Sequence, residues 1–187
     1  MSKANPELPA DTSHRLNPIS YVILGLLQLR GPSTPYDLKR AVERSIQYFW
    51  PFPHAQLYGE TDRLAGLGLV TKEQQEGGRR RKVFTLAPAG RAALETWFLK
   101  SPEHLFELRD MAILQLFFSD FMGTDRLADL AHEQVTHHHQ RIAIFEEIAA
   151  RGAGHSGERR MLPLDLGIRL AQTCADFWAE VAGRTDA

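Results

Sequence analysis

The amino-acid sequence predicts a mainly α-helical protein with one small β-hairpin, arranged as an N-terminal winged helix-turn-helix and a C-terminal helical dimerisation domain. Apolar residues recur at helical spacing along most of the 187 residues. Two glycines, Gly77 and Gly78, separate two short runs of strand-like composition. Residues 1–100 hold 14 Lys and Arg against 9 Asp and Glu, whereas residues 101–187 hold 8 against 14. A basic half joined to an acidic half indicates that one part binds a polyanion.

Three short helices are expected after a disordered arm, residues 1–16, which is polar and lacks periodicity. The first helix begins at Asn17-Pro18, an N-cap followed by proline, and ends at Gly31-Pro32. The second begins after Ser33 or Thr34, with Pro35 in its first turn. The third covers the segment HAQLYGETDRLAGLG. These helices and the hairpin predict a DNA-binding domain over residues 17–100 and a dimerisation domain over residues 101–187.

The hairpin carries four consecutive cations in the segment EGGRRRKV, residues 76–83. A Gly-Gly loop favours a tight turn because both central positions take positive φ. If Gly77 and Gly78 form that turn, Leu69 lies opposite Leu86 at the base and the cations lie near the tip. Arginine grips phosphate oxygens with a planar fork, so DNA phosphate is the expected ligand of Arg79, Arg80, Arg81 and Lys82. The alternative is a charged tip that only keeps the hairpin edge soluble.

In a winged helix-turn-helix, the third helix enters the DNA major groove while the hairpin lies on the flanking phosphates. Helical spacing places Gln56, Gly59, Glu60 and Arg63 on its outward side. Gln56 and Arg63 are the predicted base readers, because these side chains pair with adenine and guanine. Phosphate contacts are predicted for Tyr36, Lys39 and Tyr58. The alternatives are an ordinary solvated helix face and, for Tyr58, a half-buried core position.

Six stretches carry a resemblance to a known family. YVILGLLQLRGPSTPYDLKRAVE, FWPFPHAQLYGETDRLAGLGLV and EGGRRRKVFTLAPAGRAALETWF resemble the winged-helix domain of the PadR family of bacterial transcriptional regulators. LRDMAILQLFFSDF, HHHQRIAIFEEI and LGIRLAQTCADFWAEV resemble the helical C-terminal domain of the longer, virulence-activator-like members. The resemblance implies a repressor that responds to small, often aromatic compounds. The aromatic connector around Trp50 is expected to be core, or to line an effector cavity together with Trp97.

The C-terminal half is expected to form helices that associate with a second copy of the chain. One helix is predicted from about Leu108 to Phe121 and a long one from Thr124 to Arg151. Apolar seams are expected along the long helix (Leu127, Ala131, Val135, His138, Ile142, Phe145, Ala149) and the last helix (Leu166, Leu170, Cys174, Phe177, Val181). A helix of that length extends beyond what a small domain covers, so a homodimer binding double-stranded DNA is predicted. The alternative is an intramolecular bundle.

No metal, cofactor or catalytic activity is predicted. His132, His137, His138 and His139 lie on one predicted helix, and consecutive helical residues point in different directions and do not converge on one ion. Cys174 is expected to be a small buried hydrophobe. The chain lacks a glycine-rich phosphate loop and a nucleophile elbow.

The expected location is the cytoplasm, because no apolar run is long enough to span a bilayer and the N-terminus lacks a secretory signal. The alternative function is a winged-helix module that binds an acidic protein without specific DNA binding.

Overall fold

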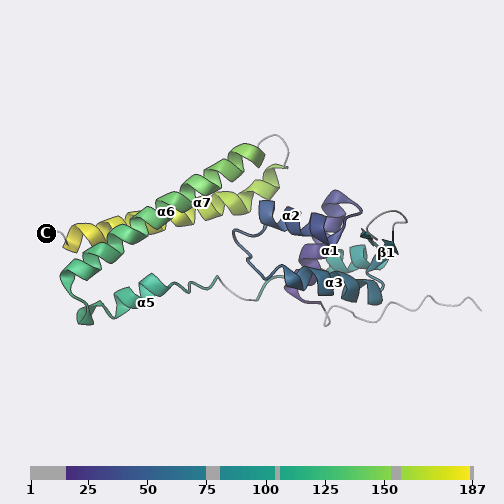
Figure 1. The fold of residues 1–187 in the computed structure, drawn as a ribbon, viewed down its shortest axis with the longest axis horizontal. Coiled ribbons are helices and arrows are strands. Elements are labelled where there is room, and N and C mark those ends of the chain that lie inside the picture. The colour runs from purple at the N-terminus through teal and green to yellow at the C-terminus, as the bar shows by residue number, and fades with distance from the viewer. Residues whose placement is uncertain (1–15, 75–80, 104–105, 153–156, 186–187) are drawn as a thin grey trace, which may run out of the picture. The chain divides into compact units, whose positions relative to one another are not determined.

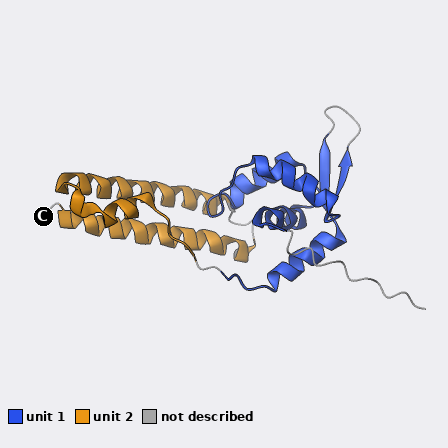
Figure 2. Ribbon diagram, turned by 90° about the horizontal axis from the view of Figure 1, so that it is seen from below, with its two compact units in different colours: residues 1–104 blue, residues 105–187 orange. Residues whose placement is uncertain are grey.

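The computed structural model of the chain describes residues 16–74, 81–103, 106–152 and 157–185 (Figure 1). The chain divides into two compact units, residues 1–104 and 105–187 (Figure 2). Apart from Leu16, the expected N-terminal arm lies outside the described residues. Within the described residues, no helix is long and apolar enough to cross a membrane.

The described part of unit 1 forms four helices and one hairpin: α1 (Pro18–Arg30), α2 (Pro35–Ser45), α3 (Ala55–Gly66), β1 (Val70–Gln74), β2 (Lys82–Leu86) and α4 (Pro88–Phe98). Asn17 caps α1 and Thr34 caps α2, each with a reciprocal hydrogen bond to the third helical residue. Gly31 ends α1 with φ 77°, a value that glycine adopts without a steric cost. The predicted beginnings of these two helices are therefore confirmed.

The core of unit 1 joins α1, α2 and α3 to the base of the hairpin. Ser33, between α1 and α2, exchanges two backbone hydrogen bonds with Phe84 of β2, at 3.0 and 2.9 Å. Helix α4 begins directly against β1: a Cβ built on Gly90 would lie 2.1 Å from the carbonyl oxygen of Leu69. The fully buried apolar side chains of this core include Ile23, Leu24, Leu38, Val42, Leu57 and Leu64.

The hairpin is antiparallel as predicted, but its register differs by one residue. Val70, not Leu69, lies opposite Leu86, and Gln74 lies opposite Lys82. The turn predicted at Gly77 and Gly78 lies outside the described residues. Because a shift of one residue turns a side chain to the other face of the ladder, Lys72 and Lys82 now share a face with the buried Phe84.

Unit 2 contains α5 (Met111–Phe117), the short 3₁₀ helix η2 (Ser119–Phe121), α6 (Thr124–Gly152) and α7 (Glu158–Thr185). Helices α6 and α7 lie side by side along most of their length (Figures 1 and 2). The single helix predicted from Leu108 to Phe121 is wrong. Helix α5 begins later because the carboxylate of Asp110 accepts hydrogen bonds from the first-turn N–H groups of Ala112 and Ile113.

The predicted seam of α6 is confirmed, and α7 of the same chain packs against it. Ala131 and Phe145 are buried, and His138 and Ile142 are half-buried. Phe145 meets α7, where a Cβ built on Gly167 would lie 3.1 Å from its ring. The intramolecular alternative therefore holds for this seam.

The predicted seam of α7 is not the surface that packs within the chain. Helix α7 packs through Leu164, Ala171, Ala175, Trp178 and Ala182, all buried. These mostly small side chains allow α6 to approach closely. Leu166, Leu170 and Phe177 of the predicted seam are 57%, 40% and 41% exposed, and Cys174 is half-buried.

Candidate nucleic-acid interface

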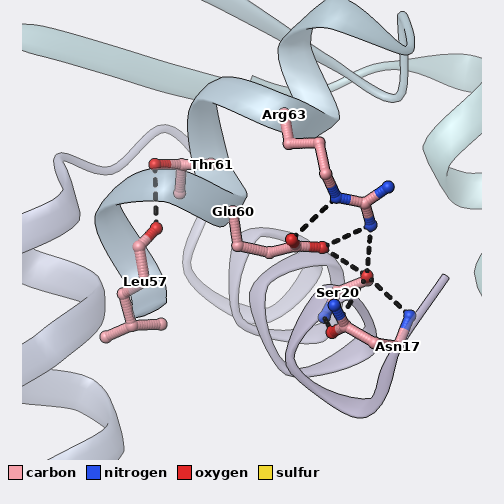
Figure 3. Close-up of polar contacts among 6 residues, drawn as sticks. All are labelled: Asn17, Ser20, Leu57, Glu60, Thr61 and Arg63. Carbon is pink, nitrogen blue, oxygen red and sulfur yellow. Dashed lines mark hydrogen bonds and ion pairs between the residues drawn. The ribbon is translucent and has the colours of Figure 1, made fainter. Parts of the chain in front are cut away.

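Helix α3 has one buried side and one solvent side. Leu57, Thr61 and Leu64 are fully buried, and the Thr61 hydroxyl donates to the carbonyl oxygen of Leu57 at 3.0 Å (Figure 3). Gln56 and Tyr58 are exposed, with Tyr58 46% exposed. The structure thus places both side chains on the solvent side, as expected for contacts with a nucleic acid.

Glu60 corrects the expected arrangement, because it is not on the outward side of α3. Its side chain is buried against the first turn of α1, where the Ser20 hydroxyl donates to the Glu60 carboxylate (Figure 3). Arg63 donates to the same carboxylate from Nε at 2.8 Å and from Nη2 at 2.7 Å. Ser20 also shares the capping box of α1 with Asn17. The ion pair between Glu60 and Arg63 lies within α3, and its hydrogen bonds with Ser20 join it to the beginning of α1.

The pKa of Glu60 is lowered on balance. Burial alone raises this pKa, but the hydrogen bonds from Arg63 and Ser20 and the positive charge of Arg63 outweigh that effect. Glu60 therefore carries a negative charge at neutral pH, and the hydrogen bonds that stabilise this charge fix the Arg63 side chain.

The same contacts restrict what Arg63 can bind. Its Nη2 donates both to Glu60 and, at 3.1 Å, to Ser20, so Nε and Nη2 are both engaged. The Nη1 group points away from the carboxylate (Figure 3). A guanidinium that contacts guanine bidentately uses two nitrogens. In this arrangement Nη1 suits a single phosphate oxygen better than a guanine edge.

Asp62 connects α3 to both strands of the hairpin. Its two carboxylate oxygens accept hydrogen bonds from Lys72 Nζ at 2.7 Å and from Lys82 Nζ at 3.2 Å. All three side chains remain partly exposed. The hydrogen bond from Lys72 has the largest effect on the pKa of Asp62 and lowers it. Burial opposes this effect, and the bond from Lys82 adds a further lowering, so the pKa is lowered on balance. The predicted phosphate contact Lys82 is therefore already ion-paired, and Lys72 was missed because its position depends on the register.

The remaining predicted phosphate contacts lie on α2 and the hairpin. Tyr36 is 57% exposed, and the guanidinium carbon of Arg40 lies 6.0 Å from the centre of its ring. Lys39 is half-buried and forms an ion pair with Glu43 at 3.5 Å. Arg81 is exposed directly before β2. Arg79 and Arg80 lie outside the described residues.

The two tryptophans proposed for effector binding lie on different elements of unit 1. Trp97 of α4 stacks on Tyr21 of α1, with ring centres 4.7 Å apart and 12° between the planes. Trp50 lies in the connector after α2 and is 48% exposed, and its neighbour Phe49 is 50% exposed. The expectation that the whole aromatic connector is core is therefore wrong.

The histidines of α6 do not gather around one point. Within the described part of the chain, no group of three His, Cys, Asp or Glu side chains is placed to hold a metal ion. His138 differs from His137 and His139 because it is half-buried, whereas they are exposed. Burial lowers the pKa of its imidazole, and the charge of Asp110 partly opposes that effect.

Two family models match this chain, one in each unit. The model described as the transcriptional regulator PadR-like family matches residues 23–96, and the virulence activator alpha C-term model matches residues 108–185. The chain belongs to the PadR-like family of transcriptional regulators. The family predicted from the sequence is confirmed.

Two curated proteins are similar to this chain in sequence. The negative transcriptional regulator PadR of Bacillus subtilis is 26% identical over 119 residues, which cover 63% of this chain and 65% of that protein. A probable transcriptional regulator of Mycobacterium tuberculosis is 36% identical over 67 residues, 35% of each chain. The matched stretches thus span less than two thirds of either relative.

Solved structures extend the likeness over both units. The crystal structure of B. subtilis PadR with operator DNA has a TM-score of 0.81 and 20% identity, covering 90% of this chain and 99% of that chain. The same protein with p-coumaric acid gives 0.78 and 18%, covering 92% and 99%. The Vibrio cholerae virulence activator AphA gives 0.70 and 26%, covering 90% and 98%. The predicted fold class is confirmed.

Proposed function

We propose that this PadR-like regulator acts as a homodimeric repressor that binds a two-fold operator and responds to a small aromatic compound. The observation that carries the proposal is the solvent side of α3, with Gln56 and Tyr58, beside a hairpin that bears Lys72, Arg81 and Lys82. A helix flanked by a basic hairpin fits the major groove and its adjoining phosphates. The same fold in B. subtilis PadR was solved with operator DNA.

In this proposal Gln56 reads a base, while Arg63 binds phosphate through Nη1. The other side chains proposed to bind phosphate are Tyr36, Lys39, Tyr58, Arg79, Arg80, Arg81 and Lys82. Gln56→Ala then reduces the preference for operator over scrambled DNA by about 1–3 kcal/mol. Arg63→Ala weakens both duplexes alike, as expected for a side chain that binds the DNA backbone.

Exposed apolar side chains of unit 2 support the homodimer. Phe117 and Phe121 are 79% and 91% exposed, and the bulky seam of α7 is also open. Soluble chains rarely leave apolar patches of that kind uncovered, so a second copy is their proposed partner. Sedimentation at micromolar concentration tests this, and a compact monomer of 21.1 kDa would contradict it.

The decisive test of DNA binding is a salt titration. Fluorescence anisotropy measures affinity for DNA from upstream of the protein's own gene, with scrambled duplex for comparison. Replacing Arg79 and Arg81 together with alanine removes two cations that are proposed to bind phosphate. The slope of log affinity against log salt then becomes shallower by about 0.9 for each phosphate that is no longer neutralised. An unchanged slope would assign the hairpin charge to solubility or to an acidic protein partner instead.

The effector part of the proposal rests on the exposed aromatic side chains of unit 1 and on the relative solved with p-coumaric acid. Trp50 and Trp97 are the side chains proposed to bind the effector. Titration with p-coumaric acid is expected to quench tryptophan fluorescence and to release operator DNA, and Trp97→Phe should reduce the quenching. Release without any change in fluorescence would place the effector away from these side chains.

The proposed location is the cytoplasm, where the chromosome of a bacterial cell lies.

A further inference from the structure

We propose that Asp62 is a built-in competitor for DNA phosphate: its carboxylate holds Lys72 and Lys82 in the free protein and must release them before the hairpin binds the DNA backbone. This inference rests on the proposed DNA-binding function. It assigns Asp62 a role in limiting affinity rather than in contacting DNA.

The position of Asp62 on α3 supports this role. It follows Gly59 by three residues and precedes Gly66 by four, so it shares the outward side of the helix with both glycines. A Cβ built on either glycine would meet no atom within 4 Å, which means that this side is open. An acidic side chain there approaches the DNA phosphates together with the helix, and like charges repel.

The geometry around Asp62 explains how the acid is tolerated. Each carboxylate oxygen accepts from a different lysine, Oδ1 from Lys72 at 2.7 Å and Oδ2 from Lys82 at 3.2 Å. The hydrogen bond to Asp62 also raises the pKa of Lys72. One carboxylate therefore occupies two ammonium groups, and a phosphate oxygen that binds either lysine replaces a carboxylate oxygen of Asp62.

The competition predicts that removing the Asp62 charge strengthens DNA binding. Asp62→Asn keeps the size of the side chain but no longer neutralises either lysine. Each additional phosphate that a released lysine neutralises steepens the slope of log affinity against log salt by about 0.9. Over the tenfold fall from 1 M to 0.1 M salt, the affinity of the variant relative to the wild type then rises about eightfold. Affinity for operator and for scrambled duplex rises alike, because binding to the DNA backbone carries no sequence information.

The matched control is Glu73→Gln. Glu73 lies on β1 beside Lys72 and is exposed, but the register pairs it with Val83, so it lies on the opposite face of the hairpin from the two lysines. This variant changes the net charge by the same amount without releasing a lysine. An equal gain in affinity in both variants would overturn the proposal in favour of general electrostatics.

A second control removes the lysines. In a chain that already carries Lys72→Met and Lys82→Met, adding Asp62→Asn is expected to give only the small gain in affinity of Glu73→Gln. A full gain in that background would overturn the proposal. Weaker binding of Asp62→Asn to the operator alone would also overturn it, and would make Asp62 a base reader that accepts from cytosine.

A measurement without DNA separates this inference from the proposed function. The pKa of the Asp62 carboxyl, followed by NMR in the full-length protein, is expected to be low and to rise toward its ordinary value in the lysine double variant. A pKa that does not respond overturns the ion-paired arrangement itself. If the pKa responds but neither the wild type nor Asp62→Asn binds any duplex, competition with phosphate is overturned together with DNA binding.

Discussion

Removing the Arg63 side chain is expected to destabilise unit 1 more than its partly exposed position suggests. Glu60 is 7% exposed, and Arg63 donates hydrogen bonds to both of its carboxylate oxygens. Arg63→Ala therefore leaves a buried carboxylate without its cationic partner. Breaking a buried pair from one side costs about 3–5 kcal/mol, and we expect the lower end because water reaches the Arg63 side.

A companion variant isolates the buried charge as the cause. Glu60→Gln alone should cost about 1.5–3 kcal/mol, the usual range for a hydrogen bond to a charged group. Adding Glu60→Gln to Arg63→Ala should raise stability above that of Arg63→Ala alone, because the double variant no longer buries an unpaired carboxylate. Two destabilising changes that partly cancel are the signature of this ion pair.

The pH dependence supplies an independent check. In the wild type the lowered pKa of Glu60 means that its stabilising effect is present at neutral pH and is lost as the pH falls through the folded-state pKa. In Arg63→Ala the effect of burial dominates and the pKa of Glu60 rises above its ordinary value. Acidification then neutralises the buried charge, so the stability difference between wild type and Arg63→Ala should shrink between pH 7 and about pH 5.

The assay is hydrogen exchange of α1 and α3 amides in the full-length chain, combined with denaturant unfolding. Local exchange is needed because the two units need not unfold in one transition. A stability difference that does not change with pH, or a double variant less stable than Arg63→Ala, would refute the reasoning from a buried carboxylate.

Three further outcomes are expected from other parts of the chain. Gly59→Ala should stabilise α3 by about 0.5–1 kcal/mol, because the surroundings of Gly59 are open, yet it should weaken all DNA complexes. Gly90→Ala should destabilise unit 1, because the added Cβ would lie 2.1 Å from a backbone oxygen. Thermal unfolding compares the stability of the two variants. Phe177→Glu should dissociate the dimer in sedimentation, while Ala179→Glu, on another side of α7, should not. Burial lowers the pKa of His138, so unit 2 should lose stability as the pH falls below about 6.5, and His138→Leu should flatten that dependence in acid unfolding.

The helix beginnings in unit 1 could be predicted because their causes are local. Asn17 and Thr34 each cap a helix whose first residue is proline. The side chain of the residue three positions after the cap completes each capping box within the same turn. The burial of Glu60 could not be predicted in that way. A carboxylate at the edge of the buried side of α3 is stabilised there by Arg63 of the same helix and also by Ser20, 40 residues earlier in the chain. Spacing within one helix does not contain that information.

The hairpin shows the same limit at a finer scale. The composition of the two strands predicted their existence. Register depends on which side chains the core accepts, and burying Val70 opposite Leu86 moved the ladder by one residue. That small difference brought Lys72 and Lys82 to one carboxylate of α3 and changed which cations are free for DNA.

Helix α7 presents two seams of suitable period, and hydrophobicity alone does not show which of them packs within the chain. Leucine and phenylalanine gain more from burial than alanine does. However, α6 is long and must remain close to α7 over many turns, which small residues such as Ala171 and Ala175 permit. The bulkier seam, including Leu170 and Phe177, is then left for another surface. Its exposure in one chain is therefore what a dimer requires, because a seam used to hold α6 could not also bind a second copy.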